Sequence, residues 1–353
     1  MTYATSFCIN RHFFLYLIYT LTCVVYVSCR EKRVYLSPVE NVLLAPKMML
    51  LYNAERLDPH LELFMEKFLD HTQHDVNEAE VVILPLPYEG TASYLKGTGG
   101  GPDAILKASL QLEEMEEELR WEPSTALKLH TADAIKPGRD ESPESYITKI
   151  EEFLGIIPED KVIIGLGGEH TVTVPLAMRV MTPGDTLIAI DAHPDLRDSY
   201  EGSRYSHACV TRRLCEAGYS AIQLGVGCIS AGELEYIESG ASVEHFPATG
   251  LATEKGLEAA VNRIKALKGG AYLTIDLDGL STSYMPGVGT PVPGGIEWHA
   301  LLSILKALFF NDDVTVKGMD IVELRPIEGQ VLSEFSAAKI IQKMLSYNWG
   351  RKR

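Results

Sequence analysis

Three short segments of the sequence combine carboxylates and imidazoles in a way that could hold metal ions. The densest is Asp191-Ala-His-Pro-Asp195, which follows the apolar run 186–190. Side chains two residues apart in an extended chain lie on the same face, so Asp191, His193 and Asp195 would converge. Unpaired charges at the end of a buried strand are unfavourable, and a bound cation removes that penalty. We therefore predict a metal site here, with a salt-bridged strand end as the alternative.

The other two segments supply further ligands. The segment 273–278 (LTIDLD) places Asp276 and Asp278 on one face after an apolar run. The segment 165–170 (GLGGEH) passes from an apolar run through glycines, which let the backbone turn tightly and approach a ligand, to His170. His170 on its own would indicate a structural role. Four carboxylates and two imidazoles without a thiolate suit Mn²⁺ best, with Zn²⁺, Fe²⁺, Co²⁺ or Ni²⁺ as alternatives.

A pair of metal ions that shares carboxylates points to hydrolysis. Such a pair lowers the pKa of water toward neutrality and so supplies a nucleophile at neutral pH. The ligand set therefore predicts a hydrolase that depends on two divalent cations.

An α/β fold with a parallel sheet would position these segments. Short apolar runs alternate with longer helical patterns, and several runs are apolar on both faces, as expected when helices cover both sides. The expected strands are 81–85, 161–166, 186–190, 221–226, 272–275 and 314–321. The expected helices are 102–119, 142–154, 173–180, 207–217, 257–267 and 298–310. The three segments follow strands, at the edge where such sheets bind ligands.

The N-terminal part differs from the rest of the chain. Residues 13–28 are almost wholly apolar and are flanked by basic residues, but a membrane span needs about 20 residues. A signal peptide, an anchor and a translated upstream extension are all compatible with this pattern. We expect residues 1–47 to form a separate segment and 48–353 to form one catalytic domain. We expect a cytoplasmic location, although this segment leaves secretion or anchoring open.

The charge and the cysteines narrow the function further. A net charge of −16 argues against a nucleic-acid partner, which needs a basic surface, and suits a small cationic substrate. Acidity that serves solubility alone is the alternative. The six cysteines include no C-x-x-C pair, so they indicate free thiols in a reducing compartment instead of a zinc ribbon.

The motifs GGEH, DAHPD and TIDLDGL, followed by MPGVGTPVPGG, resemble the signature segments of the ureohydrolases, which include arginase, agmatinase and related amidinohydrolases. The similarity covers residues 79–345, and the segment 87–113 resembles the corresponding part of agmatinase-like members. The resemblance implies a three-layer α/β/α domain around a mainly parallel, arginase-like sheet. It also implies a homo-oligomer, either a trimer or a hexamer.

The resemblance assigns roles to individual residues. Asp191 and Asp276 would bridge the two metals. His207 matches the position of a proton-shuttling histidine, and Glu323 matches a carboxylate that grips the guanidinium group. The alternatives are a core histidine and a surface ion pair between Glu323 and Arg325. The full ligand sets would be His170, Asp191, Asp195 and Asp276 for one metal, and His193, Asp191, Asp276 and Asp278 for the other.

The chain also departs from the family pattern. Ser281-Thr282 stands where Asp-Pro is usual, and Pro194 replaces a common threonine, which puts the loop over the site in doubt. The Asn that arginases place two residues after the counterpart of Asp195 is missing, which favours agmatine, giving putrescine and urea. The alternatives are guanidinobutyrate, guanidinopropionate, formiminoglutamate or guanidine as substrate, or a non-catalytic metal-binding member.

Overall fold

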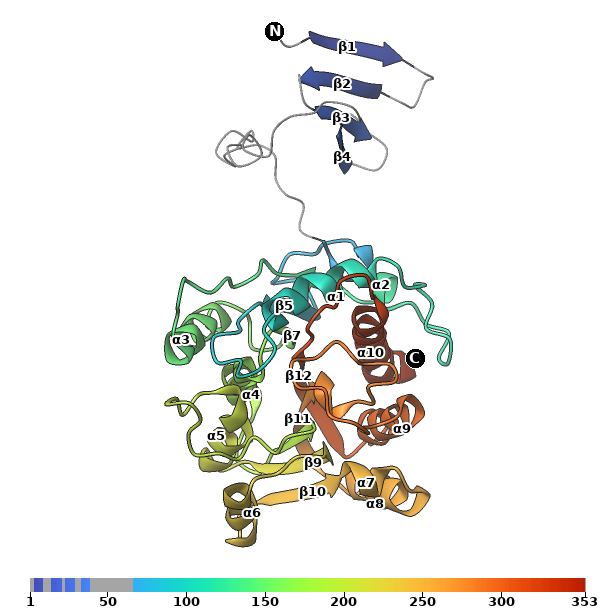
Figure 1. The fold of residues 1–353 in the computed structure, drawn as a ribbon. Helices are drawn as coiled ribbons and strands as arrows, with labels where there is room; N and C mark the ends of the chain where they lie inside the picture. Colours follow the sequence, from blue (N-terminus) through green and yellow to red (C-terminus); the bar gives the residue numbers. More distant parts are fainter. Residues whose placement is uncertain (1–2, 9–13, 21–22, 29–32, 39–65, 353) are drawn as a thin grey trace. The chain divides into compact units, whose positions relative to one another are not determined.

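The structure is a computed structural model that describes residues 66–352 and the backbone of four segments nearer the N-terminus, 3–8, 14–20, 23–28 and 33–38 (Figure 1). The chain divides into two compact units, Met1–Phe64 and Met65–Arg353. The expected boundary between residues 47 and 48 lies outside the described residues and stays a prediction.

The first unit contains a four-stranded antiparallel sheet in the order β1-β2-β3-β4. Its strands are β1 (Tyr3–Cys8), β2 (Phe14–Thr20), β3 (Cys23–Ser28) and β4 (Arg33–Pro38). The described part of the apolar stretch thus forms two paired strands. No helix among the described residues is long and apolar enough to cross a membrane. The roles expected for this stretch, as a signal, anchor or extension, stay predictions.

The second unit is built on an eight-stranded sheet in the order β10-β9-β8-β11-β12-β7-β5-β6, and every pair in it is parallel. This confirms the predicted α/β class. The central strands are apolar and buried along nearly their whole length, because helices cover both of their faces. The strands are β5 (Val81–Leu86), β6 (Leu129–Thr131), β7 (Val162–Gly167), β8 (Thr186–Ile190), β9 (Ser220–Val226), β10 (Val243–Pro247), β11 (Gly269–Asp276) and β12 (Val314–Val322).

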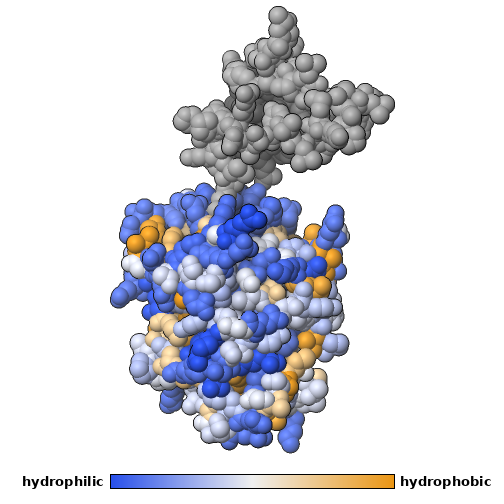
Figure 2. Space-filling model, turned by 60° about the vertical axis from the view of Figure 1, so that its left-hand side comes forward, coloured by the Kyte–Doolittle hydropathy of each residue, from blue (hydrophilic) through white to orange (hydrophobic). Residues whose placement is uncertain are grey.

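Helices pack on both faces of this sheet and give three layers (Figure 1). One apolar core joins the sheet to α1, α8, α9 and α10, and a second joins it to α3, α4 and α5. The helices are α1 (Gly101–Ser109), α2 (Pro123–Ala126), α3 (Pro143–Leu154), α4 (Thr173–Val180), α5 (Val210–Glu216), α6 (Ala231–Glu238), α7 (Ala248–Leu251), α8 (Glu254–Lys265), α9 (Trp298–Phe309) and α10 (Leu332–Trp349). The face drawn in Figure 2 is mostly hydrophilic with small separate hydrophobic patches, as the strongly acidic composition leads one to expect.

The expected helix 102–119 is wrong over its second half, because α1 ends at Ser109. The acidic residues that follow it do not form a solvated helix face. Glu116 is fully buried and forms an ion pair with Lys343, which is also fully buried and comes from α10. Lys343 additionally pairs with Glu117 at 2.6 Å. Pairing with a buried lysine fixes this segment in a turn instead of a helix.

The order of the strands brings the functional segments together. Strands β8, β11, β12 and β7 are consecutive neighbours in the sheet, and all four run in the same direction. Their carboxyl ends therefore lie at one edge, where β8 leads into Asp191, β11 ends at Asp276, β12 leads into Glu323 and β7 leads toward His170. This is the edge at which open α/β sheets bind ligands.

Candidate metal centre and active site

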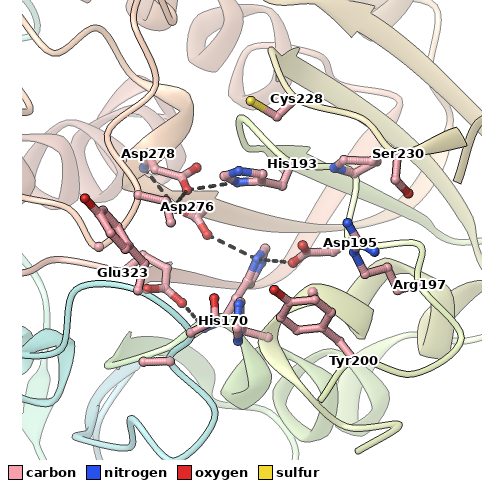
Figure 3. Close-up of a pocket in the computed structure, with 18 of the residues that line it drawn as sticks. His170, His193, Asp195, Arg197, Tyr200, Cys228, Ser230, Asp276, Asp278 and Glu323 are labelled. Carbon is pink, nitrogen blue, oxygen red and sulfur yellow. Dashed lines mark hydrogen bonds and ion pairs between the residues drawn. The ribbon is translucent and has the colours of Figure 1, made fainter. Parts of the chain in front are cut away.

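A cluster of carboxylates closes around one nitrogen of His170 (Figure 3). His170 begins the 3-10 turn His170–Val172 after β7 and is almost completely buried. Its Nδ1 lies 2.9 Å from Asp195 Oδ2, and 3.3 Å from both Asp191 Oδ2 and Asp276 Oδ2. The structure thus brings together four of the predicted ligands from the ends of three strands.

A second group shares Asp191 with the first. His193 Nδ1 lies 3.0 Å from Asp278 Oδ2 and 3.7 Å from Asp191 Oδ1, so Asp191 offers one oxygen to each group. Within each triad, His170–Asp191–Asp276 and Asp191–His193–Asp278, the candidate ligand atoms lie within 4.8 Å of one another. This arrangement suits the bridging position expected for Asp191. Asp276 belongs to only one triad, and its bridging position stays a prediction.

The orientation of the His170 ring indicates what Nδ1 faces. The Thr274 hydroxyl donates to Asp320 Oδ1 at 2.5 Å, and Thr274 Oγ1 lies 3.0 Å from His170 Nε2. Because the hydroxyl hydrogen is used by Asp320, the oxygen accepts from Nε2–H, and in the neutral ring Nδ1 carries a lone pair. This lone pair points at carboxylate oxygens, and the buried Nδ1 has no hydrogen-bond partner. The lone pair and the carboxylate oxygens repel one another unless a positive charge lies between them.

The pKa shifts of these groups reflect the same excess of negative charge. Burial lowers the pKa of His170, but its contacts with Asp191, Asp195 and Asp276 outweigh burial and raise it well above the ordinary value. Burial also raises the pKa of Asp191, and the charge of Asp195 adds to the effect. The pKa of Asp276 is raised well above its usual range by burial and by the charges of Asp278 and Asp191. Each buried carboxylate therefore makes its neighbours harder to ionise.

Two divalent cations fit this donor set. They carry as much positive charge as the four carboxylates carry negative charge, and the His170 lone pair already faces the space between the oxygens. Imidazole and carboxylate together, without a thiolate, are ligands that Mn²⁺ and its first-row neighbours accept. The residues present are therefore suited to a pair of metal ions.

Two residues of the site have an unusual backbone conformation. Asp195 has φ 52° and Glu323 has φ 66°, in the left-handed region that costs a non-glycine residue about 1–3 kcal/mol. The Glu323 amide donates to Gly168 O at 2.7 Å, and Asp195 O accepts from the Arg212 amide at 3.0 Å. These bonds hold both side chains at the pocket in spite of the strain.

The glycines of the GGEH motif serve the packing of the protein backbone. A Cβ added at Gly168 would lie 2.0 Å from Tyr88 O, and one at Gly167 would lie 2.6 Å from a Val172 methyl group. We expected these glycines to let a ligand come close to the backbone. Instead, the loop after β5 and the turn after β7 pack against them. Their tight packing places His170 against the sheet edge.

Glu323 lies beside the carboxylate cluster and lines the same pocket (Figure 3). Its Oε1 accepts from the His170 amide at 2.9 Å, and no described residue donates to Oε2. Burial, followed by the charge of Asp276 and that of Glu169, raises the pKa of Glu323 well above its usual range. A carboxylate held in this way can form a charge-assisted pair with a cation that enters the pocket. The alternative ion pair with Arg325 is not formed; the Arg325 guanidinium instead donates to Lys96 O at 2.9 Å.

His207 follows Asp195 along the chain, in the segment between β8 and α5, and lines the same pocket. It begins the short turn His207–Cys209 before α5, capped by Ser206, and it is half-buried. Its Nδ1 lies 2.9 Å from Thr91 Oγ1, and its ring meets the Tyr200 ring edge-on at 5.8 Å between centroids. The alternative interpretation was a histidine buried in the core, but His207 is half-buried and lines the pocket.

The pocket over the cluster has a volume of about 360 Å³. Three segments form its wall, and the sequence analysis assigned no binding role to their individual residues. They contribute Ala92–Leu95, Arg197 and Tyr200, and Cys228–Ser230 with Glu233. Thr91 and Glu169 were also missed, although both lie inside quoted motifs, because nothing in the sequence alone pairs residues so far apart.

The Ser281-Thr282 departure lies away from the pocket wall, whereas Pro194 and Arg197, the other two departures, line the pocket. Ser281 is buried, its amide donates to Ile296 O at 3.0 Å, and neither it nor Thr282 lines the pocket. The same loop still presents Thr290, whose hydroxyl donates to Asp278 Oδ2 at 2.8 Å. The loop therefore retains a direct contact with a candidate ligand.

Comparison with known proteins agrees with this geometry. The family model for the Arginase family matches residues 79–346. An N(1)-aminopropylagmatine ureohydrolase from Synechocystis sp. is 37% identical over 285 residues, which cover 78% of this chain and 91% of that relative. An agmatinase from Pyrococcus horikoshii is 32% identical over 277 residues, covering 76% of this chain and 91% of that protein.

A solved structure is similar over the same region. The crystal structure of agmatine ureohydrolase of Thermoplasma volcanium aligns with a TM-score of 0.74 at 26% identity, covering 81% of this chain and 95% of that chain. The match spans the parallel sheet and its helices, in agreement with the predicted three-layer fold. On the fold, the family match and these relatives, the chain belongs to the arginase family of metal-dependent ureohydrolases.

Proposed function

We propose that this enzyme hydrolyses agmatine to putrescine and urea, using two Mn²⁺ ions. The observation that carries the proposal is a pair of histidine–carboxylate triads that share Asp191 at the base of a pocket, with Glu323 beside them. The charge balance supports two divalent cations, and the oxygen and nitrogen ligands favour Mn²⁺ among them.

The proposed ligands are the six predicted from the sequence. Asp191 offers an oxygen to both groups, which supports its assignment as a bridge. Asp276 is proposed as the second bridge. It lies beside His170 in the first group, and the charge of Asp278, a member of the second group, also acts on it. One ion would be held by His170, Asp191, Asp195 and Asp276, and the other by His193, Asp191, Asp276 and Asp278.

Each step of the proposed reaction has a residue to perform it. When bound, the two cations lower the pKa of water and supply a nucleophile at neutral pH. Glu323 Oε2 binds the guanidinium group and holds its carbon next to the cluster, in a charge-assisted contact. His207 transfers a proton to the departing nitrogen as the C–N bond breaks, so that the amine leaves in neutral form.

A cation in the wall of the pocket bears on the choice between the candidate substrates. Arg197 stands two residues after Asp195 and lines the pocket, half-buried, with its guanidinium 5.0 Å from the centre of the Tyr200 ring. A guanidinium only donates hydrogen bonds, so it cannot accept one from an ammonium group, whether the α-ammonium of arginine or the terminal ammonium of agmatine. Arg197 would suit a carboxylate tail, which makes guanidinobutyrate the sharpest competitor among the simple substrates.

N(1)-aminopropylagmatine is a second candidate substrate. Relatives with that activity reach 36–37% identity, compared with 32% for the agmatinase. The cavity of about 360 Å³ extends past the cluster to Glu233, a buried carboxylate in the pocket wall that pairs with no Lys or Arg among the described residues. Its Oε2 accepts from the Ser230 amide and hydroxyl and its Oε1 accepts from the Leu196 amide, so one lone pair of Oε1 is left for an additional amine.

The test is release of urea from a panel of guanidino compounds by protein freed of metal and reloaded with Mn²⁺. The panel contains agmatine, N(1)-aminopropylagmatine and guanidinobutyrate, with the other proposed substrates beside them. The highest kcat/KM with agmatine supports the proposal, and the highest value with guanidinobutyrate assigns Arg197 to the substrate tail. No urea from any of them would support the non-catalytic alternative. The expected trimer or hexamer and the cytoplasmic location stay predictions.

A further inference from the structure

Glu169 is a buried carboxylate to which the proposed chemistry gives no role. It lies between β7 and His170, is fully buried, and has no Lys or Arg partner among the described residues. Its two oxygens accept three hydrogen bonds, from the Thr91 amide at 2.7 Å, the Thr91 hydroxyl at 2.7 Å and the Thr171 hydroxyl at 2.8 Å. The Thr171 hydroxyl also lies 3.0 Å from Tyr205 O and has one hydrogen for both contacts, so the two bonds from Thr91 are the ones that hold the Glu169 carboxylate as an acceptor.

The Thr91 hydroxyl joins this carboxylate to His207. Thr91 Oγ1 lies 2.9 Å from His207 Nδ1 and 3.1 Å from the His207 amide nitrogen. A hydroxyl has one hydrogen and two lone pairs, and Glu169 takes the hydrogen. The oxygen must therefore accept in both of its contacts with His207. Nδ1 then carries a hydrogen, and Nε2, to which no described residue is bonded, is left with a lone pair.

We propose that Glu169 and Thr91 position His207, by holding its ring in the Nδ1–H form so that Nε2 is the nitrogen that handles the proton. The inference rests on the proposed function of His207. In that reaction the attacking water loses a proton to Nε2, and its oxygen bonds to the guanidinium carbon. Nε2 passes the proton to the departing nitrogen, which keeps the electron pair of the broken C–N bond. The ring returns to the Nδ1–H form.

A competing contact comes from Ser206, whose Oγ lies 3.3 Å from His207 Nδ1. If the Ser206 hydroxyl donated to Nδ1, the ring would carry its hydrogen on Nε2 and could not accept a proton there. The contact is longer than the 2.9 Å to Thr91, and Ser206 Oγ caps the following turn by accepting from the Ala208 amide at 3.4 Å. The shorter contact to Thr91 favours the Nδ1–H form.

The experiment reads the tautomer directly by ¹⁵N NMR of the histidine rings. The full chain is labelled with ¹⁵N-histidine and loaded with diamagnetic Zn²⁺, at a pH where the ring is neutral. The His207 signals are identified by their loss in His207→Asn. We expect the Nδ1–H pattern in the wild type. An Nε2–H pattern in the wild type would overturn the proposal, so this test does not depend on the folding of Thr91→Val.

Three variants then test whether the Thr91 hydroxyl sets the His207 tautomer or only supports the local structure. Thr91→Val keeps the shape of the side chain and removes the hydroxyl, so we expect His207 to lose the Nδ1–H preference. Thr91→Ser restores the hydroxyl and should restore the preference. Thr171→Val is the matched control, because it removes the hydroxyl that contacts the same Glu169 oxygen and Tyr205 O but makes no contact with the His207 ring, and it should keep the tautomer. A preference unchanged in Thr91→Val, or lost equally in Thr171→Val, would refute the assignment.

Kinetics provide the second readout, with whichever guanidino substrate the urea assay identifies. Thr91→Val should lower kcat by about tenfold to a hundredfold while KM changes little, because positioned proton transfer contributes roughly 10²–10⁴-fold and the residue does not hold the substrate. Thr91→Ser should recover most of the loss. A correct tautomer with unchanged kcat would show that His207 does not transfer the proton, which contradicts its proposed role. A shifted tautomer with no active substrate would leave the positioning intact and reject the proposed function.

Discussion

Replacing Glu323 with glutamine tests the proposed recognition of the guanidinium charge. The amide oxygen of glutamine can still accept the hydrogen bond that the His170 amide donates to Oε1 at 2.9 Å, so the turn that carries His170 should be kept. The nitrogen of the amide then takes the place of Oε2 and presents hydrogens to a group that also only donates. The substitution therefore removes the charge and the acceptor while it preserves the size of the side chain.

The expected loss follows from that single contact. A hydrogen bond to a charged group contributes about 1.5–3 kcal/mol, which corresponds to a fall in kcat/KM of roughly tenfold to a hundredfold or more. The assay is steady-state urea release with agmatine over a range of concentrations, together with metal content by mass spectrometry. We expect the metal content to be unchanged, since Glu323 is not among the proposed ligands.

A matched control is available in the same segment. Glu328 is exposed, follows the same strand, and does not line the pocket, so Glu328→Gln makes the same chemical change away from the site. Unchanged kinetics in Glu323→Gln, with the control also unchanged, would remove Glu323 from substrate binding. Loss of metal in Glu323→Gln would make it part of the metal site instead of a contact for the substrate.

Four further predictions concern the metals, the N-terminal segment and stability. Metal analysis and a structure at saturating Mn²⁺ should show two ions per chain about 3.5 Å apart, and one ion per chain would contradict the shared cluster. Asp191→Asn should abolish activity because it removes a charge shared by both groups, and near-normal turnover would refute the assignment. His193→Ala should weaken the binding of one metal ion and leave the binding of the other unchanged in a metal titration. Deleting residues 1–47 should leave a folded, active enzyme, since every candidate ligand lies in the second unit, and loss of folded protein by circular dichroism would show otherwise. Lys343→Met should lower the free energy of unfolding by about 3–5 kcal/mol in denaturant titrations, because it leaves Glu116 charged and buried. The double variant with Glu116→Leu should recover much of this loss. A loss below about 1 kcal/mol in Lys343→Met would show that the ion pair contributes little to stability.

The parts of the fold that the sequence predicted well are those with a local cause. The strand β8 was predicted with its observed bounds because an apolar run ends abruptly at Asp191. Helix α3 was predicted because Ser142 caps it, accepting from the Ser145 amide at 3.2 Å, and Pro143 occupies its first turn. In both cases the signal and the structure lie within a few residues of each other.

The errors have long-range causes. The edge strands β6 and β10 were missed, since one has three residues and the other is only partly buried. Helix α10 was not predicted, although it packs against α1 at the other end of the chain. The second half of the expected helix 102–119 was overruled by Lys343, which is more than 220 residues away from Glu116.

The site shows the same division. The spacing of two in Asp191, His193 and Asp195 marked a ligand group in the sequence, and the structure places these residues together. The bonds that orient the imidazoles could not be foreseen, because Thr274 is 104 residues from His170 and Thr91 is 116 residues from His207. Only the packing of the sheet and its loops makes such pairs neighbours.

The strand order has a consequence for how this enzyme can diversify. The candidate ligands and Glu323 lie at the ends of four central strands, where a change of length would shift the register of the whole sheet. The outer wall of the pocket instead comes from loops that begin and end on the surface, around Tyr94, Tyr200 and Ile229. Such loops tolerate insertion and substitution far better than sheet strands. Sequence changes in these three loops can therefore alter which substrate tail the pocket accommodates, while the candidate metal ligands and Glu323 at the strand ends stay unchanged.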